Sequence, residues 1–102
     1  MKFWPVYDKY VAEMVKINDG RFAVLKDYAT NYKTLTDQQA SAYITKWIEG
    51  DKALVELRLK YIPLVEKVLP LKKSAMFFQI DRRLEMLLEL ELSRGIPLVN
   101  AK

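Results

Sequence analysis

The chain has 102 residues, the usual length of one domain, and 51% of them are hydrophobic, so we expect a single folded domain over 1–102. It contains no histidine and no cysteine, which excludes imidazole and thiolate metal sites, cysteine nucleophiles and Ser-His-Asp triads. The net charge is +4, and acids are interleaved with bases along the chain, as is typical of solvated helix faces. No apolar run approaches the ~20 residues of a membrane span, and the first residues lack the apolar core of a signal peptide.

The first predicted helix covers about 5–33 and begins at Pro5, a residue suited to the first turn of a helix. The segment Asn18-Asp19-Gly20 would normally mark a turn. The apolar pattern keeps the same phase on both sides of it, which favours one helix, although two helices with a turn at Gly20 remain the alternative. The residues that set this phase are Tyr7, Val11, Met14, Leu25, Tyr28 and Tyr32.

A capping box is predicted at the segment Leu35-Thr36-Asp37-Gln38-Gln39. The Thr36 hydroxyl can accept a hydrogen bond from the backbone amide of Gln39, whose side chain can reach back to the amide of Thr36. Asp37 adds a negative charge at the positive end of the helix dipole, and Leu35 is placed to form a hydrophobic staple. The segment therefore predicts a corner where one long helix ends and another begins.

The second predicted helix covers about 36–69. Pro63 lies inside it and cannot donate to the carbonyl group of Leu59, so we expect a kink near Pro63. Gly50 lies on the apolar stripe of this helix, where the missing side chain would allow another helix to approach closely. The expected core residues on the stripe are Tyr43, Trp47, Leu54, Leu57, Tyr61, Val65 and Val68.

The third predicted helix covers about 71–94, between Pro70 and the stop signals Gly95 and Pro97. We expect its main apolar stripe to face the other helices. That stripe consists of Met76, Phe77, Ile80, Leu84, Leu87 and Leu88.

No segment has the alternation of a β-strand, so the predicted fold is all-α. A helix of about 28 residues is about 42 Å long, whereas a compact domain of this size has a radius of gyration near ~13 Å. The chain should therefore form an elongated bundle or hairpin, and its large apolar surface favours a homodimer.

Several side chains of the third helix fall outside its main stripe. One interpretation is burial against a second neighbour or a dimer partner. The other is an exposed surface on which apolar and cationic groups bind proteins through adaptable contacts. These protein-binding candidates are Phe78, Arg82, Arg83, Met86 and Leu90.

Catalytic candidates are weak. Ser41, Ser74 and Ser93 have no histidine partner, and the glutamates at 85, 89 and 91 lie on a helix, where solvated carboxylates are the default. No EF-hand spacing is present and no histidine accompanies Glu85 and Glu89, so carboxylate-only metal binding is the one kind of metal site left open. We therefore expect a non-enzymatic protein without a cofactor.

The segment Leu35-Thr36-Asp37-Gln38-Gln39 resembles the LTxxQ motif of the Spy/CpxP family, small helical proteins of the bacterial periplasm. Further segments similar to uncharacterised secreted relatives of that group are Phe3-Trp4-Pro5-Val6-Tyr7, Phe77-Phe78-Gln79-Ile80-Asp81-Arg82-Arg83 and Ile96-Pro97-Leu98-Val99. The resemblance implies a periplasmic, dimeric, cradle-shaped protein that holds unfolding clients without ATP or modulates an envelope stress sensor. A second LTxxQ motif is missing at Val68-Leu69-Pro70-Leu71-Lys72-Lys73, and the lack of histidine argues against zinc sensing.

The sequence thus predicts a Spy-like chaperone or stress-response accessory that binds apolar and acidic segments of clients. The alternative is a structural or regulatory homodimer with one specific protein partner. A third reading, a basic helical nucleic-acid binder, would require salt-sensitive retention of DNA or RNA.

Overall fold

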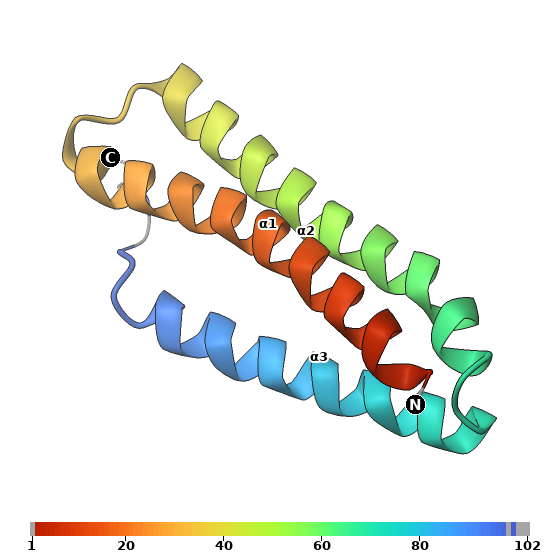
Figure 1. Cartoon of the computed structure of the whole chain (residues 1–102). Helices are drawn as coiled ribbons and strands as arrows, with labels where there is room; N and C mark the ends of the chain where they lie inside the picture. The colour runs from red at the N-terminus through yellow and green to blue at the C-terminus, as the bar shows by residue number, and fades with distance from the viewer. Residues whose placement is uncertain (1, 98, 100–102) are drawn as a thin grey trace.

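The computed structural model describes residues 2–97 and 99; Leu98 of the closing Ile-Pro-Leu-Val segment lies outside this part. It contains helices α1 (Phe3–Asn31), α2 (Asp37–Glu66) and α3 (Leu71–Ser93), with a 3-10 helix η1 (Tyr32–Thr34) after α1 (Figure 1). No strand occurs among the described residues, which confirms the all-α fold and its three long helices. The molecule measures 53 × 20 × 16 Å and has a radius of gyration of 16.6 Å, so it is elongated as expected.

The boundaries of the helices agree closely with the predicted ones. α1 runs unbroken through Gly20, so the alternative of two helices with a turn there is excluded. The capping box forms: the Thr36 hydroxyl accepts from the Gln39 amide at 3.1 Å, and the Gln39 side chain accepts from the Thr36 amide at 3.0 Å. α2 ends at Glu66 rather than near 69, so only one turn of helix follows Pro63.

The hydrophobic core lies between α1 and α2, which pack against each other along their length. Its fully buried members are Tyr10, Leu54, Leu57 and Tyr61. The core stripe predicted for the second helix is confirmed, because every one of its residues is buried or half-buried. Near the start of α1 an aromatic group extends this core to the first turns of α3; it consists of Phe3, Tyr7, Tyr10, Phe77 and Phe78.

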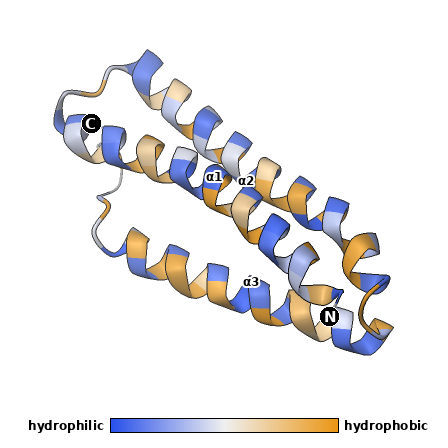
Figure 2. Ribbon diagram, viewed as in Figure 1, coloured by the Kyte–Doolittle hydropathy of each residue, from blue (hydrophilic) through white to orange (hydrophobic). Residues whose placement is uncertain are grey.

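The orientation predicted for α3 is wrong. Of its main apolar stripe only Phe77 is half-buried. The two fully buried residues of α3 are Ser74 and Glu85. Figure 2 shows hydrophobic residues along the whole visible length of α3. The stripe residues that face solvent are Met76, Ile80, Leu84, Leu87 and Leu88.

Candidate functional site: a groove between α2 and α3

A buried ionic cluster explains why α3 turns a polar face inward. Arg21 of α1 is only 3% exposed and donates hydrogen bonds to Glu85 at 2.6 Å and to Asp51 at 2.8 Å, as well as to Glu89. We call Arg21, Asp51, Glu85 and Glu89 the anchor cluster. Burial by itself lowers the pKa of Arg21, but its bonds to Glu89 and Glu85 outweigh burial and raise that pKa. The guanidinium therefore stays charged and ties α3 to both α1 and α2.

Gly50 provides the space that Arg21 needs. A Cβ atom at Gly50 would lie 2.7 Å from Cγ of Arg21, closer than two carbon atoms can approach. The missing side chain of Gly50 thus makes room for the neighbouring helix α1, through the side chain of Arg21. Arg21 also lies over the ring of Trp47, 5.1 Å from its centroid, which adds a cation–π contact.

Further hydrogen bonds hold α3 in place on both sides of the anchor cluster. Asp81 accepts hydrogen bonds from the Tyr10 hydroxyl at 2.5 Å and from Nε of Arg58 at 3.1 Å. Beyond the end of α3, the Tyr28 hydroxyl donates to the carbonyl oxygen of Pro97 at 2.6 Å. The polar face of α3 is therefore used for attachment, and its apolar side chains are left outside.

An open groove runs along the boundary of α2 and α3. It consists of three adjoining hollows of about 750, 520 and 220 Å³. Glu89 lines all three, Trp47 and Ser93 line the two larger ones, and Met86 lines the largest and the smallest. Its walls are apolar and exposed; they are formed by Ile44 and Val55 of α2 and by Met86, Leu87 and Leu90 of α3. Its floor is acidic, because Asp51 and Glu89 line it and each remains partly exposed beside Arg21.

Four of the five predicted protein-binding residues line this groove. Arg83, Met86 and Leu90 surround its largest hollow, and Arg82 lines the smallest. Phe78 does not belong to it, because its half-buried ring packs against the hydrophobic core.

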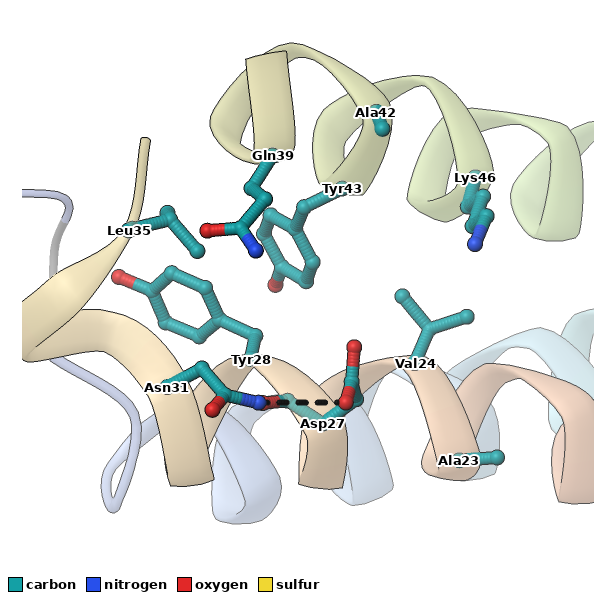
Figure 3. Close-up of a pocket in the computed structure, with 10 residues that line it drawn as sticks. All are labelled: Ala23, Val24, Asp27, Tyr28, Asn31, Leu35, Gln39, Ala42, Tyr43 and Lys46. Carbon is teal, nitrogen blue, oxygen red and sulfur yellow. Dashed lines mark hydrogen bonds between the residues drawn. The ribbon is translucent and has the colours of Figure 1, made fainter. Parts of the chain in front are cut away.

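The residues of the capping box lie elsewhere, at the corner that joins α1 to α2. Leu35 and Gln39 line another hollow of about 370 Å³, shown in Figure 3, which meets the groove at Tyr28 and Tyr43, whereas Thr36 serves as the helix cap. In this hollow the rings of Tyr28 and Tyr43 stack at 4.3 Å. At its edge the side-chain amide of Asn31 donates to Oδ1 of Asp27 at 3.3 Å.

The α2 wall of the groove was missed by the sequence analysis, although a signal for it exists. On a face of α2 outside the core stripe, apolar residues follow one another at spacings of three and four. One acidic residue interrupts this row. All the apolar members are about half exposed or more. We call this set the α2 stripe: Ile44, Ile48, Asp51, Val55 and Leu59. Ile44, Asp51 and Val55 line the groove, and Ile48 and Leu59 continue the same exposed row.

The fold and the groove define an elongated all-α protein with an apolar recess on one side. None of the described helices is long and apolar enough to cross a membrane. Within the same part of the chain no group of acidic side chains is arranged to hold a metal ion. No protein-family model, no curated protein and no solved structure matches this chain.

Proposed function

We propose that this chain is a non-enzymatic protein-binding protein whose groove holds apolar segments of other polypeptides. The observation that carries the proposal is the alignment of exposed Leu, Ile, Val and Met side chains from two helices along one recess. A large exposed apolar patch rimmed by polar groups is typical of a surface that binds protein.

The composition of the groove supports broad rather than narrow selectivity. Met86 and the leucines beside it can repack around different apolar side chains, since they impose no directional hydrogen bond. Arg82 and Arg83 on the rim would attract acidic stretches, and the acidic floor would accept a lysine or arginine. An amphipathic segment with apolar, acidic and basic side chains would match the apolar walls, the basic rim and the acidic floor.

The resemblance to Spy/CpxP proteins supports a more specific proposal for role and compartment. In that proposal the chain is an ATP-independent chaperone or stress-response accessory in the periplasm. The elongated shape and the exposed apolar surface also support self-association, and so support the alternative of a homodimer with one specific protein partner.

The test is suppression of aggregation of a chemically denatured model protein, without nucleotide, at equimolar amounts of this chain. Leu90→Lys in the groove should abolish it. Val15→Lys is a matched control on α1, because Val15 is 52% exposed and Leu90 is 54% exposed. Equal loss in both variants, or no suppression by the unmodified chain at several-fold excess, would contradict the proposal.

Binding in the groove can be observed directly through Trp47. The chain has two tryptophans, so Trp4→Phe leaves Trp47 as the only indole. A synthetic amphipathic helix of leucine and lysine should shift its emission, since Trp47 lines the recess and packs on Arg21. The same helix with serine in place of leucine is the matched control and should bind less tightly, because it cannot fill the apolar walls of the groove.

A further inference from the structure

We propose that α3 of a second copy of this chain occupies the groove in a two-fold dimer, and that clients bind only when this dimer opens. The inference rests on the proposed function, because it names the resident occupant of the same groove.

The outer face of α3 has the pattern that the groove requires. Along this face two apolar residues are followed by one charged residue and then by two more apolar residues. Consecutive members of the row are four, three, four and three positions apart. We call this set the α3 stripe: Met76, Ile80, Arg83, Leu87 and Leu90. The α2 stripe has the same order, with Asp51 where the α3 stripe has Arg83.

The two central charges are complementary and available. Asp51 uses Oδ1 for Arg21, and its Oδ2 accepts no hydrogen bond from any described residue. Arg83 is exposed and forms no ion pair within the described part of the chain. A parallel pairing of the α2 stripe with an α3 stripe from a second copy would place Arg83 beside Asp51, with apolar pairs on both sides.

The direction of the helices permits this pairing twice in one symmetric dimer. α2 and α3 are joined by a short turn and run antiparallel (Figure 1). An α3 that lies antiparallel to its own copy therefore runs parallel to the α2 helix of the other chain. In a two-fold dimer the same contact then forms on both sides, as an isologous interface requires.

The level of the two-fold axis also follows from the anchor cluster. Asp51, Glu85 and Glu89 bind the same guanidinium, so an Arg83 placed opposite Asp51 lies level with residues 85–89 of the other α3. The axis then passes close to Met86, and the two α3 helices overlap over most of their length, from about residue 77 to the end of α3.

The exposed area agrees with such a dimer. A compact protein of 12.0 kDa exposes about 6,000 Å². This chain exposes 7870 Å², an excess of roughly 1,900 Å². A stable interface of standard size removes about 800 Å² from each partner. The excess is thus large enough to be covered by a second copy.

Symmetry makes this dimer a closed form of the protein. Each groove holds the α3 stripe of the other chain, so neither groove is open to a client. Client binding and self-association then compete for one surface, and the dissociation constant of the dimer sets how much binding surface is available.

The first test is sedimentation equilibrium of the full chain over a wide range of concentration. Arg83→Glu should raise the dimer dissociation constant by about 10- to 100-fold. Asp51→Asn keeps the side-chain oxygen that accepts from Arg21 but removes the charge opposite Arg83, and it should raise the constant in the same direction. The two changes in one chain should cost less than the sum of the single changes, because both remove the same pair. Val15→Glu, on α1 and outside both stripes, should leave the constant unchanged.

A second test does not depend on the charge pair. The chain has no cysteine, so Met86→Cys introduces a single thiol next to the expected axis. Oxidation of the Met86→Cys variant should link two chains by a disulfide bond. The Val15→Cys variant should form no such link under the same conditions. The oxidised dimer should no longer shift Trp47 emission with the leucine–lysine helix, and reduction should restore the shift.

The outcomes separate this inference from the proposed function. A chain that stays monomeric at every concentration, yet binds the helix, overturns the dimer and leaves the proposed function standing. A linked dimer that binds the helix as well as the reduced protein overturns the closed form. A chain that dimerises, but binds no helix even as the monomeric Arg83→Glu variant, refutes the proposed function and retains the dimer.

Discussion

Arg21→Met is the change that tests most directly how α3 is attached. Methionine has a similar length and fills most of the space of the arginine, but it removes the cation shared by Asp51, Glu85 and Glu89. The side chain of Glu85 is only 9% exposed, so its carboxylate would remain buried without a partner. The other two carboxylates reach water and lose much less.

The expected magnitude follows from Glu85. Removing one partner of a buried ion pair costs about 3–5 kcal/mol, and we expect the lower end because the remaining carboxylates of the cluster are partly solvated. A domain is stable by only about 5–15 kcal/mol, so the loss should appear clearly in urea unfolding followed by circular dichroism. Amide exchange should show α3 opening before α1 and α2.

The double variant Arg21→Met/Glu85→Leu is the matched control for this reasoning. It removes both buried charges, and replacing a whole buried pair by apolar residues is often neutral or stabilising. Stability should therefore return to within about 1 kcal/mol of the unmodified chain or exceed it. A single variant that loses less than about 1 kcal/mol, or a double variant no better than the single one, would refute the role assigned to the cluster.

Three other predictions concern single residues. Gly20→Ala should stabilise the chain by up to about 1 kcal/mol, because nothing lies near the added methyl group, whereas Gly50→Ala should destabilise it in the same thermal melts by displacing the arginine behind it. Thr36→Ala should cost about 1 kcal/mol in urea unfolding through the lost cap, and a much smaller loss would mean that the cap is not formed. Burial and a hydrogen-bonded carboxylate raise the pKa of Tyr61 to about 12 and that of Tyr10 further still. These folded-state pKa values exceed the unfolded value of about 10. The contribution of the two tyrosines to stability should therefore be fully present below pH ~10 and be lost as pH rises towards ~12. The Tyr61→Phe variant should show a smaller loss of stability over this range in thermal melts at graded pH.

The sequence determines the helices well because their signals are local. The capping box at Thr36 and the stop at Gly95 depend on residues within one turn, and the structure has helix boundaries close to those they predict. The core stripe of α2 follows the 3.6-residue period and is buried as expected.

The inward face of α3 could not be predicted in the same way, because it depends on residues more than sixty positions away. Asp81, Glu85 and Glu89 follow a helical spacing of four, which equally describes a solvated face. Only the pairing with Arg21 and Tyr10 turns that face inward. A hint was available in α1: at the spacing of its stripe, the positions between Met14 and Leu25 are filled by Asn18 and Arg21.

The structure divides α3 into two faces with separate tasks. Its polar face holds it against α1 and α2 through hydrogen bonds and ion pairs, which require particular partners at particular positions. Its apolar face contributes little to that attachment, since residues such as Leu84 and Leu87 are 62% exposed. In most bundles one apolar face must serve both folding and association, so a change that weakens binding also loosens the core. Under the proposed function, the outer face can change its apolar residues, and with them its partners or its affinity for a second copy, while the anchor cluster keeps the fold.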